Sequence, residues 1–136
     1  MINTKCRILF LSRELSGYFL SSIQHALLKY PNWEIRIVYW PINDQAPFEF
    51  DLFSDRLELW PVENVDDHEM DRMQSQWSPN LWVVSGWADK KYMRWSKKYA
   101  DVYKVITFDT QWEDSLKFKL GVLYLYFKSI RNFQGV

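Results

Sequence analysis

The chain has 136 residues, a length that fits a single domain with one sizeable hydrophobic core. Hydrophobic residues make up 48% and charged residues 25% of the sequence, which excludes a disordered chain and a collagen-like one. The 17 basic and 17 acidic residues leave no net charge, so there is no basic field to attract nucleic acid. The single cysteine, Cys6, excludes an intrachain disulfide framework and a cysteine-rich zinc site. We therefore expect a cytoplasmic protein that does not bind nucleic acid.

The apolar runs of the sequence are short. Residues 8–11 are too few for the core of a signal peptide. The longest run, residues 120–127, is far shorter than the roughly 20 residues that span a bilayer. The sequence therefore predicts no transmembrane segment.

The first forty residues follow the pattern strand, helix, strand. Residues 7–11 (RILFL) are a short apolar run typical of a buried strand. A helical repeat of apolar residues follows and ends at Pro31; its members are Leu20, Ile23, Leu27 and Tyr30. Residues 34–40 (EIRIVYW) alternate polar and apolar side chains, which predicts a second strand that stops at Pro41.

Strands and helices continue to alternate along the rest of the chain. The predicted elements are a peripheral strand at 56–60, a helix at 66–76, a strand at 81–85, a helix at 90–100, a strand at 103–108 and a helix at 116–133. This pattern predicts one α/β domain over residues 1–136, a Rossmann-like three-layer domain with a mainly parallel sheet. With the common doubly wound strand order, strands 7–11 and 81–85 are neighbours at the switch point, where ligands bind beyond the carboxyl ends.

The last predicted helix carries two apolar rows. Its inner stripe, which we expect to face the sheet, consists of Leu116, Leu120, Leu123, Phe127 and Ile130. The second row consists of Phe118, Val122 and Leu125. This row either is buried within the domain or contacts a second copy, another domain or an anionic membrane surface. Among the contacts outside the domain, the pattern favours a protein, and therefore self-association through residues 116–133.

Three loops are expected to meet beyond the carboxyl ends of the strands. Their candidate substrate-binding residues are Ser12, Arg13, Glu14, Gly17, Gly86, Trp87, Asp109, Gln111 and Trp112. This mixture of hydroxyl, charge, amide and indole suits a sugar, because polar groups bond its hydroxyls and indole faces pack on its ring. The alternative is that the same residues are loop polars, helix caps and packed indoles.

Asp109 is the candidate catalytic residue, because it directly follows an apolar strand and can act as a general base or a hydroxyl ligand. Capping the next helix is its alternative role. Residues 12–17 contain neither a dinucleotide fingerprint nor a P-loop, so no nicotinamide or triphosphate site is expected. No metal is expected either, because Arg72 stands where a zinc-protease helix beginning at His68 would place its second histidine.

Three segments carry a resemblance to a known family. They are RILFLS at 7–12 with its Ser-Gly loop, SPNLWVVSGW at 78–87, and VITFDTQW at 105–112. In this order, over most of the chain, the sequence resembles the N-terminal half of a GT-B glycosyltransferase of the retaining, group-one type. In place of the glycine-rich turn that is common in the family, this chain has Ser12, Arg13 and Glu14.

The resemblance implies an acceptor-binding domain that forms one wall of the catalytic cleft. The acceptor would be a glycan or a lipid-linked sugar, and a nucleotide sugar would be the donor substrate, with no further cofactor. The family's donor-binding domain has no counterpart in these 136 residues. We therefore expect a partner domain or subunit, an inactive isolated chain and a location in the cytoplasm or at the inner face of a membrane.

A non-catalytic α/β binding module of the flavodoxin-like or receiver-like kind is the alternative function. A receiver needs an acidic pair after its first strand, and here only Glu14 follows that strand.

Overall fold

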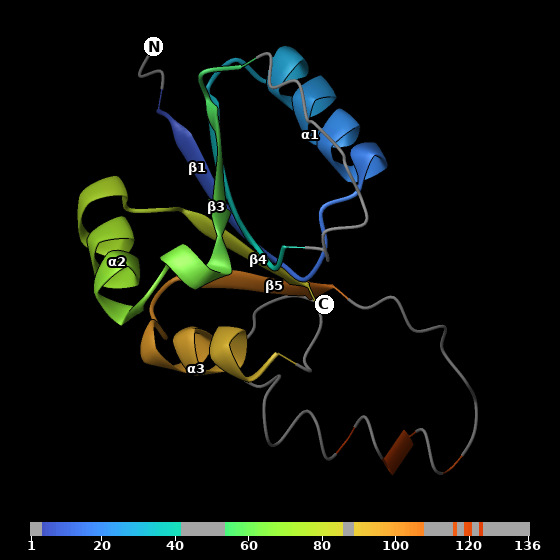
Figure 1. Ribbon diagram of the computed structural model, residues 1–136, viewed down its shortest axis with the longest axis vertical. Helices are drawn as coiled ribbons and strands as arrows, with labels where there is room; N and C mark the ends of the chain where they lie inside the picture. Colours follow the sequence, from blue (N-terminus) through green and yellow to red (C-terminus); the bar gives the residue numbers. More distant parts are fainter. Residues whose placement is uncertain are drawn as a thin grey trace.

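The sheet of this protein consists of parallel strands in the order β3-β2-β1-β4-β5 (Figure 1). The structure, a computed structural model, describes residues 4–41, 54–85 and 89–107, together with Leu116, Lys119, Leu120 and Leu123. The strands are β1 (Cys6–Ser12), β2 (Trp33–Tyr39), β3 (Leu57–Pro61), β4 (Leu81–Ser85) and β5 (Tyr103–Thr107). The helices are α1 (Gly17–Lys29), α2 (Asp67–Arg72) and α3 (Lys90–Lys98), with the single turns η1 (Val62–Asn64) and η2 (Met73–Trp77).

Helices cover both faces of the sheet (Figure 1). On one face, Leu20, Ile23 and Leu27 of α1 pack on the inward side chains of β1, β2 and β3. On the other face, Tyr92 and Trp95 of α3 pack with residues of α2 and the central strands. The fold is therefore α/β with an all-parallel sheet between two helical layers, and the predicted Rossmann-like three-layer architecture is confirmed.

The strand register brings the first and fourth strands together. Leu11 of β1 pairs with Val84 of β4, so the predicted adjacency of these strands is confirmed. Ser85 pairs in turn with Thr107 of β5. Because all strands are parallel, the loops that follow β1, β4 and β5 leave the sheet at the same edge. We call this edge the carboxyl edge.

Helix α1 begins and ends at well-defined caps. The Ser16 hydroxyl accepts a hydrogen bond from the backbone N–H of Phe19 at 3.0 Å, a standard N-terminal cap. At the other end the helix stops at Lys29, so Tyr30, the last member of the predicted helical repeat, is the residue after the helix and is 38% exposed. Arg56 caps this end, because its guanidinium donates to four carbonyl oxygens in and beyond the last turn.

The helix predicted at 66–76 divides into α2 and the wider turn η2. Asp66 caps α2, since its carboxylate accepts the N–H of Glu69 at 2.8 Å. The five residues of η2 form a π-helical turn that ends at Ser78, whose φ of 51° is left-handed. The wide turn buries Met73 and places Trp77 against Arg36 of β2.

The predicted inner stripe of the last helix does not face the sheet at the positions that the structure describes. Leu116, Leu120 and Leu123 are helical and are 74%, 57% and 52% exposed. Helical spacing identifies an apolar row but not the surface that covers it, which explains the error. The other residues named for this helix lie outside the described residues. No helix of the described part is long and apolar enough to cross a membrane.

Candidate functional site at the carboxyl edge

The loop that follows β1 has one buried residue, and the two residues before it are exposed. Leu15 is 2% exposed and packs with the α1 side of the core. Arg13 and Glu14 are exposed, and neither side chain forms an ion pair or hydrogen bond with a described residue. The loop therefore presents a cation and an anion at the switch point between β1 and β4.

Ser12 holds this loop in place. Its hydroxyl donates to the carbonyl oxygen of Glu14 at 3.1 Å, and its own carbonyl oxygen accepts from the Tyr92 hydroxyl at 2.7 Å. The side chain is 7% exposed. Ser12 thus fixes the backbone conformation of the loop that carries Arg13 and Glu14. Direct contact between Ser12 and a substrate stays a prediction.

A buried network joins the ends of two strands to the start of α3. The single proton of the Tyr92 hydroxyl is shared between the carbonyl oxygens of Ser12 and, at 3.2 Å, of Val38 in β2. Asp89 caps α3 by accepting the N–H of Tyr92 at 2.9 Å, and its second carboxylate oxygen accepts the indole N–H of Trp40. Burial, with a smaller effect of Asp89, raises the pKa of Tyr92 far above its ordinary value. The phenol therefore remains a hydrogen-bond donor at any physiological pH.

Sequence reasoning missed Trp40, Asp89 and Tyr92 as a unit. Asp89 carried a local signal, since an aspartate directly before a helical run is a typical N-cap. Tyr92 lies within the helix predicted at 90–100, and no role was predicted for its hydroxyl. Its hydroxyl bonds to residues that lie 54 and 80 positions away, and no local pattern encodes such contacts.

The start of α1 also faces this edge. A Cβ atom placed on Gly17 would meet nothing within 4 Å, so there is room for a ligand beside the helix terminus. The first turn of α1 contains no acidic residue, and its partial positive charge adds to that of Arg13. Tyr18, the next residue, is 85% exposed. Together these groups favour a ligand with an anionic group and a ring that can stack on an aromatic side chain.

Gly86, Trp87, Asp109, Gln111 and Trp112 lie outside the described residues. Since Ser85 and Thr107 end β4 and β5 side by side, the two strands that lead to these residues finish at the carboxyl edge. Their role in a substrate site stays a prediction, including that of Asp109 as the catalytic residue.

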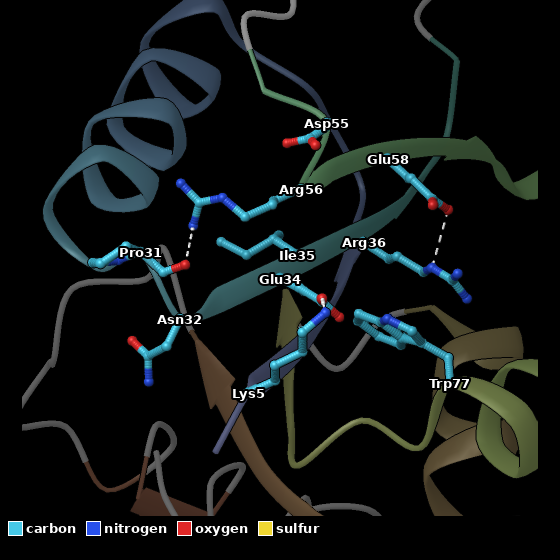
Figure 2. Close-up of a pocket in the computed structure, with 10 residues that line it drawn as sticks. All are labelled: Lys5, Pro31, Asn32, Glu34, Ile35, Arg36, Asp55, Arg56, Glu58 and Trp77. Atoms are coloured by element: carbon cyan, nitrogen blue, oxygen red, sulfur yellow. Dashed lines mark hydrogen bonds and ion pairs between the residues drawn. The ribbon is translucent and has the colours of Figure 1, made fainter. Parts of the chain in front are cut away.

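A cavity of about 460 Å³ lies at the opposite edge of the sheet (Figure 2). Most of its charged side chains already have partners: Lys5 pairs with Glu34, and Arg36 pairs with Glu58 at 3.0 Å. The hydrogen bond from Lys5 is the main reason that the pKa of Glu34 is lowered. Arg56 is engaged in capping α1. Because parallel α/β sheets bind ligands beyond their carboxyl ends, we assign this cavity a structural role.

Within residues 4–41, 54–85 and 89–107, no cluster of three or more His, Cys, Asp or Glu side chains could hold a metal ion. Comparison with family models, curated proteins and solved structures gives no match for this chain. The fold and the geometry of the carboxyl edge therefore carry the functional argument.

Proposed function

We propose that this chain is the acceptor-binding domain of a GT-B glycosyltransferase. The complete enzyme would transfer a sugar from a nucleotide-sugar donor to a glycan or a lipid-linked acceptor. The donor would be held mainly by a separate domain or subunit across the cleft. Asp109 is the candidate base in this proposal, and Trp87, Gln111 and Trp112 are candidate contacts of the acceptor sugar.

The observation that carries the proposal is the strand order. In the described sheet β2 lies between β1 and β3, which is the order 3-2-1-4-5 of a Rossmann-type domain. A flavodoxin-like or receiver-like module has the order 2-1-3-4-5, in which β1 lies between β2 and β3. The order found here supports the Rossmann-like half of a GT-B enzyme over the alternative module.

The open loop after β1 supports an acceptor that carries an anionic group. Arg13 and the start of α1 are positive, and Gly17 leaves space beside them, while the exposed carboxylate of Glu14 can accept hydrogen bonds from hydroxyl groups of the acceptor. A lipid-linked acceptor carries its sugar on a phosphate, which such a site would attract. The Tyr92 network fixes the loop, so that little conformational entropy is lost when the acceptor binds.

The proposal is tested by titrating the chain with glucose 1-phosphate, a soluble analogue of a phosphate-linked sugar, while backbone amide resonances are recorded by NMR. We expect the largest shifts at Arg13, Gly17 and Tyr18. Arg13→Ala should weaken binding about tenfold, the loss of one charge-assisted hydrogen bond. Arg94→Ala is the matched control, because Arg94 is an exposed arginine that pairs with Asp67 on α2.

Two results would contradict the proposal. One is a set of shifts that avoids the loop after β1 or is unchanged by Arg13→Ala. The other is saturable binding of flavin mononucleotide at this loop without binding of the sugar phosphate, which would favour the flavodoxin-like module.

A further inference from the structure

A second groove, of about 310 Å³, lies on the flank of the molecule between β3 and the helical segment α2–η2. Its lining residues include Arg36, Trp60, Glu69, Arg72, Gln76 and Trp77. We call it the Trp60–Trp77 groove. The carbonyl oxygen of Trp77 accepts from Arg7 near the amino end of β1, so the groove extends toward the edge opposite the acceptor site. It is therefore separate from the proposed cleft.

The two indoles of this groove are held in fixed positions. The guanidinium carbon of Arg36 lies 4.5 Å from the centre of the Trp77 ring and 5.6 Å from that of Trp60 (Figure 2 shows Trp77 beside Arg36). Cation–π contacts of this kind orient an indole. Both tryptophans are only partly buried. Each packs against the core and beside Arg36, keeps part of its surface exposed, and loses little freedom when a ligand binds.

The charges around the groove cancel in pairs. Arg36 lies 3.0 Å from Glu58, and Arg72 lies 2.7 Å from Glu69. The exposed amide of Gln76 adds a neutral donor and acceptor. A charged ligand would gain little here, because each cation already has an anion beside it. A neutral ligand with many hydroxyl groups would meet planar polar groups at the rim.

We propose that the Trp60–Trp77 groove binds a neutral saccharide unit. Aromatic rings pack against the C–H face of a pyranose, and the Arg72, Glu69 and Gln76 side chains can bond its hydroxyls. The volume of the groove suits one or two sugar rings. The proposal does not rest on the function assigned to the carboxyl edge, because it concerns other residues and predicts binding in the absence of any donor or acceptor.

The experiment is an NMR titration of the chain with methyl α-D-glucopyranoside, methyl α-D-mannopyranoside and methyl β-D-galactopyranoside. The indole N–H resonances of Trp60 and Trp77, assigned from single variants, report binding directly. Glucuronate and glucosamine serve as an anionic and a cationic comparison. We expect at least one neutral glycoside to shift both indole resonances, and to bind more tightly than either charged sugar.

Variants locate the site. Trp77→Ala should weaken binding about tenfold, as expected for the loss of an aromatic stacking contact. Gln76→Ala changes only an exposed side chain and should weaken it about threefold, the effect of one hydrogen bond, even if Trp77→Ala does not fold. Tyr103→Ala is the control, because Tyr103 is an aromatic residue on the opposite edge strand and is 53% exposed.

The proposal is overturned if no neutral glycoside shifts either indole resonance. It is also overturned if both groove variants bind as tightly as the wild type, or if Tyr103→Ala weakens binding as much as they do. Preferential binding of a charged sugar would likewise reject a site for neutral saccharides.

Discussion

Replacing Tyr92 with phenylalanine tests the network that holds the carboxyl edge. The substitution keeps the buried ring and its contact with Trp95, whose ring centre lies 6.1 Å away. It removes the hydroxyl whose single proton is shared between the carbonyl oxygens of Ser12 at 2.7 Å and Val38 at 3.2 Å. A buried acceptor left without its donor costs about 1–3 kcal/mol. Because the second bond is long, we expect the free energy of unfolding to fall by about 2 kcal/mol.

Urea denaturation followed by tryptophan fluorescence measures this loss. The midpoint should fall while the slope with urea concentration stays constant, because the surface exposed on unfolding does not change. Tyr103→Phe is the control: Tyr103 is 53% exposed, and the change should stay within about 0.5 kcal/mol. If Tyr92→Phe unfolds at the same urea concentration as the wild type, the network does not stabilise the carboxyl edge and the reasoning fails.

The same variant has a signature at alkaline pH. Burial raises the pKa of Tyr92 above its ordinary value of 10.0, so the unfolded chain loses this proton before the folded one does. Tyr92 therefore makes the free energy of unfolding fall as the pH rises above about 10. Tyr92→Phe should show a shallower fall over that range. Some fall should remain, because burial and a hydrogen bond to Asp71 raise the pKa of Tyr99 to about 12.

Three further predictions follow from other contacts. Arg56→Met should lower the free energy of unfolding by about 2 kcal/mol, because four carbonyl oxygens lose their donor. Urea denaturation measures this loss, and an unchanged midpoint would reject the capping role of Arg56. A hydrogen bond from Trp95 lowers the pKa of Asp67, and one from Lys98 lowers the pKa of Asp71, both below the ordinary value of 3.8. The stability that these carboxylates give is therefore lost as the pH falls through the lowered pKa values. The double variant Asp67→Asn, Asp71→Asn should depend less on pH in that range; an unchanged acid transition would contradict this. Finally, under the proposed function the chain supplies one wall of the cleft and cannot align donor and acceptor by itself, so it should release negligible nucleoside diphosphate from any nucleotide sugar. Rapid release by the purified chain would show that it is catalytically sufficient.

Local patterns predicted most of the fold. The spacing of Leu20, Ile23 and Leu27 locates α1, and the apolar run at 81–85 coincides with β4. These signals work because burial of one face imposes a period on the sequence. The π-helical turn at Met73–Trp77 was not predicted, because a wider turn contains the same kinds of residue as an α-helix.

The candidate site was predicted less completely than the fold. The alternation of elements predicts a parallel sheet. The position of the loop after β1 depends on the strand order as well, and that order was taken from the common doubly wound arrangement. The group that holds the loop comes from elsewhere in the chain: it is Tyr92 of α3, and Trp40, directly after β2, bonds to Asp89 at the start of that helix. The Arg56 cap of α1 is a contact of the same long-range kind. The periodicity of a single sequence predicts which face of a helix or strand is buried. It does not show which distant polar groups form hydrogen bonds with each other.

The central position of β1 sets an order of assembly for the chain. β2 follows β1 after a single helix, so β1, α1 and β2 can associate early. β4 lies farther along the chain, beyond β3 and α2, so its pairing with β1 closes a longer loop and is expected later. Until then one side of β1 presents unpaired backbone groups, which can pair with another chain. Reciprocal bonds close this side at its start: the Asn80 side chain accepts the N–H of Arg7 and the Asn80 N–H donates to the Arg7 carbonyl oxygen, each at 2.8 Å. In pulsed hydrogen exchange, the amides between β1 and β2 should therefore gain protection before those between β1 and β4.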